Sequence, residues 1–359
     1  MTGHTDSPPE AAIAELCARI APPHAAAGRL AELRQRTLAR PVGSLGRLDS
    51  LVRRIAAIRG DADPGPLSAA VSVIAGDHGL ARHGVSAFPQ RTGARVLGLV
   101  ASGGAPVNVI AARASAPVVW ADFGLSAPVG DQSYKVASGT GDIGSADAMT
   151  PAQARRAILN GARYLHERLG AEKMIAVGEI GIGNTAAAAA LSARLLDLSP
   201  VRVVGSGSGV DRPGLQRKHE LIERALARVE RRPNDPLTLL AGLGGYEIAG
   251  NVGVILAAAA DHRVVVLDGF ITGVAALLAV RLQPEAACYL VAAHRSAEPG
   301  HQPVLDELGL EPLLDLEMRL GMASGAAFAL GLLNSTLDVA RSTPRARDVG
   351  LAGAGGEIR

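Results

Sequence analysis

The sequence of 359 residues predicts an α/β protein with a doubly wound, mainly parallel sheet and a smaller helical domain beside it. From residue 69 onward, short runs rich in Val and Ile alternate with helical stretches. This alternation is typical of parallel strands joined by helices that cover both faces of a sheet. Several of the runs end in glycine or in a charged residue, and in open α/β sheets these strand ends form the ligand-binding crevice.

Composition narrows the class of protein. Hydrophobic residues make up 48% of the chain but aromatic residues only 3%, so the core must consist mainly of Ala, Val, Leu and Ile. A net charge of +2 argues against general attraction to nucleic acid or membranes. The two cysteines, Cys17 and Cys288, have no metal-ligand spacing, and no disulfide framework is expected. The polar start lacks the apolar core of a signal peptide, which predicts a cytoplasmic protein.

Five segments are predicted along the chain. Residues 1–10 form a flexible tail, and residues 11–65 form the N-terminal helices of the small domain, because apolar residues recur there at helical spacing. Residues 66–310 form the α/β domain. Residues 311–340 form a C-terminal helical segment that completes the small domain and the site. Residues 341–359 lack clear periodicity and form a second flexible tail.

Within the α/β domain, six runs are predicted as strands, at 70–75, 117–121, 174–177, 201–204, 264–267 and 288–292. Helices are predicted at 91–113, 151–169, 214–230 and 248–260. Taken in order, these elements fit a doubly wound sheet of the Rossmann-like type.

Two glycine loops are the strongest candidates for phosphate binding. The first, VGEIGIGNT at 177–185, lies between a short apolar run and an alanine-rich run, which indicates a strand, a turn and a helix start. Free backbone N–H groups at a helix start suit a phosphate. The second, GSGSG at 205–209, follows another predicted strand, and Lys218 lies in the next helix. Each loop alone is weak evidence, and Lys218 alone is compatible with a solvated helix residue, which is the usual fate of lysine.

Three further segments carry polar residues but are compatible with simpler roles. RPVGSLGRL at 40–48 fits a plain helix entry. Asp77 and His78 follow a strand, where they suit acid–base chemistry or metal binding but also the capping of a turn. No third ligand has a recognisable spacing, so no metal site is predicted. The loop around Ser296 fits either a ligand contact or a surface turn.

These segments occur together and in a fixed order, and that combination resembles one enzyme family over residues 41–332. The matching segments are RPVGSLGRLD, AGDHGLARHGVSAFPQ, SGGAPVNVIA, GEIGIGNTAAAAA, GSGSGVD, LGGYEIAGNVG, VVLDGFITGVAAL, AHRSAEPGHQPVL and MRLGMASGAAFAL. They resemble the nicotinate-nucleotide:dimethylbenzimidazole phosphoribosyltransferases of cobalamin assembly. The resemblance implies phosphoribosyl transfer from nicotinate mononucleotide to a benzimidazole nitrogen, with release of nicotinate. It also implies a homodimer with its site near the subunit boundary, small-molecule substrates, and no cofactor or metal.

The resemblance assigns roles to particular residues. The donor and its phosphate are expected to meet Gly181, Gly183, Asn184, Thr185, Gly205, Ser206, Gly207, Lys218 and Ser296. The acceptor pocket is expected to contain Val85, Ser86, Phe88, Gln90 and Leu320. Glu179 is expected near the ribose and the reacting centre. A benzimidazole must lose its N–H proton during transfer, so a carboxylate base helps the reaction.

The sequence departs from the family at the position of that base. The family pattern has glutamate followed by glycine in the last motif, where this chain has Met322 and Ala323. Methionine cannot accept a proton, which leaves Glu179 as the surviving carboxylate. Family members usually carry arginine where this chain has Ser206, and often where it has Gly141.

The departures leave three interpretations open. The first is a transferase of this family with slow chemistry or a changed acceptor, including one outside cobalamin assembly. The second is a non-catalytic nucleotide-binding paralogue that keeps the donor site. The third is an enzyme that uses phosphoribosyl pyrophosphate, which is disfavoured because that class needs paired acids after a strand and only Asp268 is present.

Overall fold

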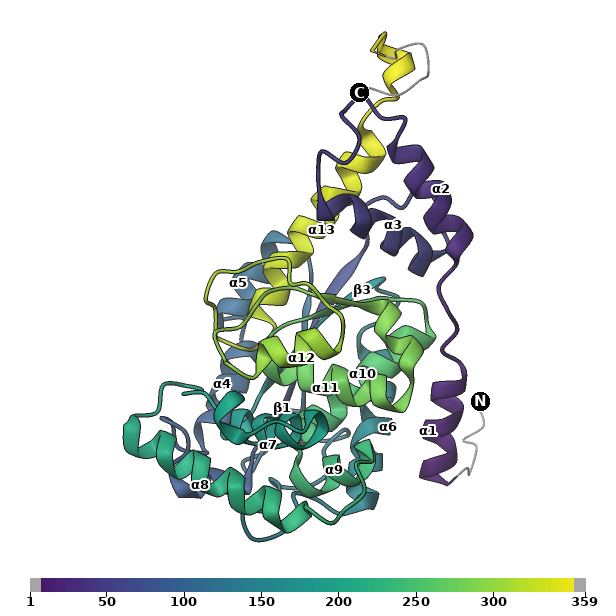
Figure 1. The fold of residues 1–359 in the computed structure, drawn as a ribbon. Helices are drawn as coiled ribbons and strands as arrows, with labels where there is room; N and C mark the ends of the chain where they lie inside the picture. Colours follow the sequence, from purple (N-terminus) through teal and green to yellow (C-terminus); the bar gives the residue numbers. More distant parts are fainter. Residues whose placement is uncertain (1–7, 352–359) are drawn as a thin grey trace.

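The computed structural model describes residues 8–351, and it contains a five-stranded sheet flanked by helices (Figure 1). All strand pairs are parallel, and the strand order is β2-β1-β3-β4-β5. The strands are β1 Ala69–Gly76, β2 Val118–Gly124, β3 Met174–Ile180, β4 Val264–Leu267 and β5 Leu290–Ala292. The predicted doubly wound parallel α/β fold is therefore confirmed. The direction of winding changes between β1 and β3, which is where ligands bind in such sheets.

The prediction of a strand at 201–204 is wrong. This segment contains a short 3-10 helix, Pro200–Arg202, instead. The amides of Val203 and Val204 both donate to the carbonyl of Pro200, at 3.1 and 2.9 Å. They are thus engaged in a local turn that begins at a proline, and are not available for a strand ladder. Both valines are buried, so their apolar character reflects packing of the turn.

The helix predicted at 91–113 is divided into α4 Thr92–Ala101 and α5 Pro106–Arg113. The break contains Gly103 and Gly104, and Pro106 begins the second helix. By length and composition, residues 92–113 are apolar enough to cross a bilayer. The break and the burial of Leu97, Val100 and Val107 in the protein core favour a role as packed helices.

Helices cover both faces of the sheet. The helix α10 Tyr246–Ala260 lies on one face of the sheet, because its Gly250 packs beside Ile74 of β1. Ile74 is the register partner of Glu179 in β3. The helix α13 Ser324–Ser342 begins on the other face, because Gly178 packs directly against Ala323. The other α-helices are α1 Pro9–Ala18, α2 Ala25–Gln35, α3 Arg47–Arg59, α6 Pro151–Arg168, α7 Asn184–Leu196, α8 Arg212–Val229, α9 Pro236–Leu243, α11 Phe270–Leu282 and α12 His301–Glu307.

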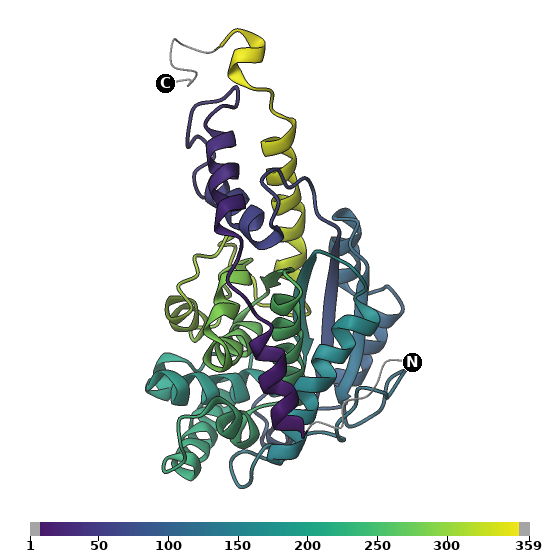
Figure 2. The same cartoon turned by 90° about the vertical axis from the view of Figure 1, so that its right-hand side faces the viewer.

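A helical stalk projects from the α/β part of the molecule (Figures 1 and 2). It consists of α2, α3 and the C-terminal part of α13, which pack together. The helix α1 does not lie in the stalk but packs against α6 and α10 (Figure 2). The segment 11–65 therefore does not form one helical unit as predicted. The remaining domain boundaries stay a prediction.

The prediction of a loose tail from residue 341 is wrong over 341–351. The helix α13 continues to Ser342, and a 3-10 helix, Ala346–Val349, follows. Backbone hydrogen bonds tie this segment to the chain after α2: Ala39 N donates to Pro344 O at 2.8 Å, and Ala346 N to Thr37 O at 2.8 Å. At the other terminus, α1 already begins at Pro9. The rest of both predicted tails, residues 1–7 and 352–359, lies outside the described residues.

Candidate active site

A cavity of about 350 Å³ lies at the carboxyl ends of β3 and β4. It receives residues from several separate parts of the sequence, which the parallel sheet brings to one edge. Of the residues predicted for the site, the cavity is lined by Phe88, Glu179, Gly181, Asn184, Thr185, Gly207, Ser296, Leu320 and Met322. Both glycine loops therefore contribute to one cavity.

Other predicted residues lie behind or beside the cavity lining. Val85 is buried, and Ser86 Oγ lies 3.1 Å from Ser208 Oγ, a hydrogen bond that joins the loop after β1 to the second glycine loop. Gln90 donates to the carbonyl of His78 at 3.3 Å. Gly205 is buried against Glu298, whereas Ser206 is exposed.

The first glycine loop leads directly into α7. Gly183 adopts φ = 96°, a conformation that favours glycine, and α7 starts at the next residue. Within residues 8–351, no side chain caps the N-terminus of α7 by a hydrogen bond. The amides of Asn184 and Ala186 donate to the carbonyls of Gly181 and Gly183 within this turn, at 3.3 and 3.0 Å. The helix start presents its positive dipole end next to Thr185, which favours a phosphate there.

Lys218 joins the two glycine loops from behind. Its side chain is fully buried, and its Nζ donates to Thr185 Oγ1 and to the carbonyl of Gly205, both at 2.9 Å. Burial lowers the pKa of Lys218 to about 8, opposed by the nearby Glu298 carboxylate. The ammonium group is thus engaged with the protein, and Lys218 holds the loops together as well as placing charge beneath them.

Arg319 was missed as a candidate, yet it is a cation that lines the cavity. Its side chain is exposed, and its Nη1 donates to the carbonyl of Gly207 at 3.3 Å. It approaches the second glycine loop from the segment before Met322, more than 100 residues later in the sequence. Its position within the ninth matching segment was the available signal, together with the absence of arginine at Ser206.

Among the described residues, Glu179 is one of three carboxylate residues that line the cavity, with Asp268 and Glu298. Burial raises the pKa of Glu179 to about 8, and the nearby carboxylates of Glu247 and Asp268 contribute in the same direction. Asn184 Nδ2 donates to its Oε2 and opposes this shift. At neutral pH the side chain is therefore mostly protonated, and it serves as a proton acceptor only after ionisation.

A layer of buried acids and histidines lies beneath Glu179. His78 Nε2 and Glu247 Oε1 are 2.7 Å apart, and both side chains are fully buried. If Gly76, at the end of β1, carried a Cβ, that atom would lie 2.8 Å from Oε2 of Glu247. Asp268 accepts from the backbone of Ala326 at 3.0 Å, at the start of α13. Among residues 8–351, no group of three or more His, Cys, Asp or Glu side chains is placed to hold a metal ion.

The rest of the cavity lining contains both polar and apolar residues. The polar ones are Thr92, Ser208, Asp268, His294 and Glu298, and the apolar ones are Phe88, Val96, Ile180, Ile182, Phe270, Ile271, Leu320 and Met322. Met322 and Ala323 adopt φ values of 59° and 61°, a backbone conformation that favours glycine. A Cβ on Gly178 would lie 2.1 Å from the backbone nitrogen of Ala323, so glycine is required there for the segment to approach the sheet. The segment that contains Met322 and Ala323 therefore packs closely against β3, although an apolar residue stands at position 322.

A phosphoribosyltransferase family model matches residues 20–350. The chain belongs to this phosphoribosyltransferase family. Its similarity to individual members extends over nearly the whole chain. It is 41% identical to the nicotinate-nucleotide–dimethylbenzimidazole phosphoribosyltransferase of Roseiflexus sp. (strain RS-1), over 95% of this chain and 98% of the relative. It is 44% identical to the enzyme of the same name from Chloroflexus aggregans, over 87% and 90% of the two chains.

The fold is shared with a solved member of the phosphoribosyltransferase family. The crystal structure of the nicotinate-nucleotide–dimethylbenzimidazole phosphoribosyltransferase from Thermus thermophilus matches with a TM-score of 0.86 at 36% identity, covering 92% of this chain and 99% of that one. The family assignment implied by the nine ordered segments is confirmed. The chain is a transferase of the pentosyl class by this membership.

Proposed function

We propose that this phosphoribosyltransferase moves phosphoribose from nicotinate mononucleotide to a ring nitrogen of a benzimidazole-like acceptor and releases nicotinate. The observation that carries the proposal is the composition of the cavity at the sheet edge. The cavity combines an uncapped helix start, two glycine loops, the lining cation Arg319 and the buried Lys218 behind the loops with apolar side chains such as Phe88, Phe270 and Leu320. The helix start and the cations suit a phosphate, and the apolar side chains suit a planar aromatic ring.

In the proposed reaction, the lone pair of an acceptor nitrogen attacks the anomeric carbon of the ribose. The bond between that carbon and the pyridinium nitrogen of the donor breaks, and its electron pair returns to the ring. Nicotinate leaves with a neutral ring, and the acceptor loses its N–H proton. The protein must hold the phosphate, orient both rings and exclude water. This role falls to the residues that line the cavity.

The proton of the acceptor is the point at which this chain differs from its family pattern. Met322 cannot accept it, and Glu179 accepts it only when ionised, because burial and neighbouring acids raise its pKa to about 8. Loss of a general base costs about a hundred- to ten-thousand-fold in rate. The proposal is therefore a slow reaction with benzimidazoles, or a faster one with an acceptor that needs no proton removal.

A second candidate is a nucleotide-binding protein that has lost the reaction. Met322 at the base position favours it, because the donor side of the cavity is kept while the acceptor base is not. Both candidates bind the same donor, and they differ only in whether the transfer reaction takes place.

We also propose a cytoplasmic homodimer, as the family resemblance implies. The exposed apolar side chains Leu30 and Leu33 on α2 support an interface that includes the stalk, since exposed apolar clusters mark contact surfaces.

The experiment that separates the candidates measures nicotinate release from nicotinate mononucleotide by chromatography, with a panel of benzimidazoles, purines and phenols as acceptors. Calorimetry with the donor alone serves as the parallel measurement. Release that depends on an acceptor supports the transferase. Donor binding without release from any acceptor supports the non-catalytic candidate. Absence of donor binding contradicts both.

A further inference from the structure

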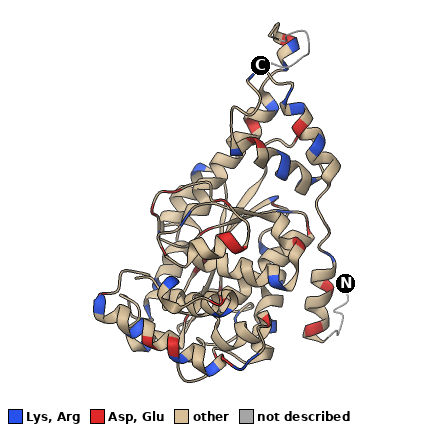
Figure 3. Cartoon of the chain, viewed as in Figure 1, with Lys and Arg blue, Asp and Glu red and all other residues tan. Residues whose placement is uncertain are grey.

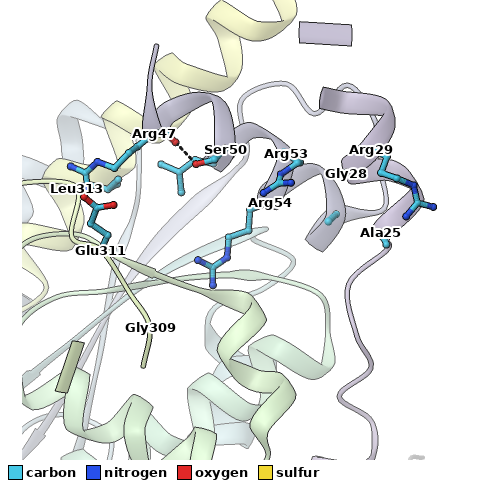
Figure 4. Close-up of a pocket in the computed structure, with 12 residues that line it drawn as sticks. Ala25, Gly28, Arg29, Arg47, Ser50, Arg53, Arg54, Gly309, Glu311 and Leu313 are labelled. Carbon is cyan, nitrogen blue, oxygen red and sulfur yellow. Dashed lines mark hydrogen bonds and ion pairs between the residues drawn. The ribbon is translucent and has the colours of Figure 1, made fainter. Parts of the chain in front are cut away.

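A second cavity, of about 590 Å³, lies away from the site, between the stalk and the loop 309–313 (Figure 4). We call it the arginine groove. It is lined by Ala25, Gly28, Arg29, Arg47, Ser50, Leu51, Arg53, Arg54, Ala57, Gly309, Glu311 and Leu313. Four of these residues are arginines, which carry guanidinium groups, and one residue, Glu311, carries a carboxylate. Figure 4 shows Arg47 beside Glu311, whereas Arg54 extends from α3 into the space above Gly309.

Carboxylates of the protein neutralise only part of the positive charge in the arginine groove. Basic residues, coloured blue on the ribbon, recur along the stalk helices α2 and α3 (Figure 3). Arg47 Nη1 lies 2.9 Å from Glu311 Oε1, so this pair is neutralised. Arg53 has its carboxylate partner, Glu32, at 3.6 Å, and both side chains are exposed. Among the described residues, Arg54 donates only to backbone carbonyls, those of Ala287 at 2.7 Å and Cys288 at 3.2 Å.

The charge of Arg54 is unfavourable in this position. Its guanidinium is partly buried without a carboxylate, and burial lowers its pKa. Arg29 lies at the far end of the groove on α2, and within residues 8–351 no hydrogen bond or ion pair is formed by its side chain. Like charges gathered in one concavity repel each other, and an anion in the groove relieves that repulsion.

We propose that the arginine groove binds an organic phosphate, a small molecule that carries a di- or triphosphate on an apolar body. Planar guanidinium forks match phosphate oxygens with paired hydrogen bonds. The volume is within the range of small-molecule sites. Leu51, Ala57 and Leu313 give the groove apolar surface for the body of the ligand. This inference does not depend on the proposed reaction.

Glu311 acts as the competitor of the bound phosphate. Among the described residues it is the one carboxylate that lines the groove, and it neutralises Arg47. A phosphate that pairs with Arg47 must displace it. Removing the charge of Glu311 therefore strengthens binding, whereas reversing the charge of Arg29 and Arg53 weakens it.

The test uses the full-length protein and calorimetric titration with pyrophosphate and with ATP. The groove variant is Arg29→Glu with Arg53→Glu, two exposed positions. The matched control is Arg224→Glu with Arg231→Glu, which changes the net charge equally at exposed positions in and just after α8. A third protein, Arg319→Ala, reports on any pyrophosphate bound in the cavity beside β3.

The groove variant is expected to bind both probes at least about tenfold more weakly, whereas the control changes by less than about twofold. Glu311→Gln is expected to bind severalfold more tightly. An equal loss in the groove variant and the control means non-specific charge attraction and overturns the proposal. A loss confined to Arg319→Ala assigns the binding to the other cavity and also overturns it. No binding of either probe to the unmodified protein has the same consequence.

Discussion

The backbone nitrogen of Met322 donates to the carbonyl oxygen of Glu179 at 3.2 Å. The residue that replaces the expected base is thus attached to the strand end that carries the surviving carboxylate. A side chain at position 322 projects beside the proposed reacting centre whatever its chemistry, because the backbone fixes its location.

Met322→Glu combined with Ala323→Gly should raise transfer to dimethylbenzimidazole by about a hundredfold, the usual return from a general base. The glycine is included because Ala323 has φ = 61°. The measurement is kcat/KM from nicotinate release, with Met322→Gln as a control of similar shape that cannot take the proton. A variant that binds donor normally but gains nothing with any benzimidazole would show that the pocket serves another purpose.

Gly178→Ala should destabilise the protein by about 1–3 kcal/mol, the range for overpacking a tight contact. The added Cβ would lie 2.1 Å from the nitrogen of Ala323, so the segment before α13 must move. Chemical denaturation measures the change. Gly98→Ala on α4 is the matched control, since nothing lies within 4 Å of its added Cβ, and it should stabilise by about 0.4–1 kcal/mol. Equal effects in the two variants would contradict the packing argument.

Glu179→Gln should flatten the pH dependence of stability. The folded protein holds a proton on Glu179 up to a pKa of about 8, whereas the unfolded chain releases it near 4.5. The free energy of unfolding therefore falls as the pH rises from about 4.5 to about 8, by on the order of a few kcal/mol. Denaturation at about pH 5 and pH 8 should show this fall in the unmodified protein and in Glu223→Gln, an exposed control, but much less in Glu179→Gln.

Glu247→Gln tests the cause of that shift from the neighbouring helix. Removing the charge of Glu247 lowers the pKa of Glu179, because the repulsion between the two carboxylates disappears. If ionised Glu179 takes the acceptor proton, the acid limb of the pH profile of kcat/KM should move to lower pH. An unmoved limb would mean that Glu179 is not the group that titrates in the reaction.

Arg319→Ala and Lys218→Met should separate two roles at the donor site. Arg319 is exposed and contacts one carbonyl, so its removal should weaken binding of nicotinate mononucleotide by about 1–3 kcal/mol with stability nearly unchanged. Lys218→Met leaves the hydroxyl of Thr185 and the carbonyl of Gly205 without their donor, so it should also lower stability by about 1–3 kcal/mol. Calorimetry and denaturation on the same samples distinguish these outcomes.

The sheet was predictable because strand runs, glycine turns and helical periodicity agree along the α/β part of the chain. The error at 201–204 arose from β-branched composition, which is shared by strands and by buried turns that start at a proline. The burial of Lys218 had a visible signal, since it lies on the apolar stripe of α8 with Leu221, Ile222 and Ala225. The contact of Arg319 with Gly207 had no local signal, because it depends on how two distant loops meet at the sheet edge.

The helix α13 connects the cavity to the tip of the stalk. It begins beside Met322 and ends where the chain meets the residues after α2, and its 19 residues form a rod about 28 Å long. A tilt of about 3° over such a length moves one end by about 1.5 Å, and catalysis is sensitive to displacements of about 1 Å. A tilt of α13 at the tip of the stalk would therefore shift the wall of the cavity that contains Met322.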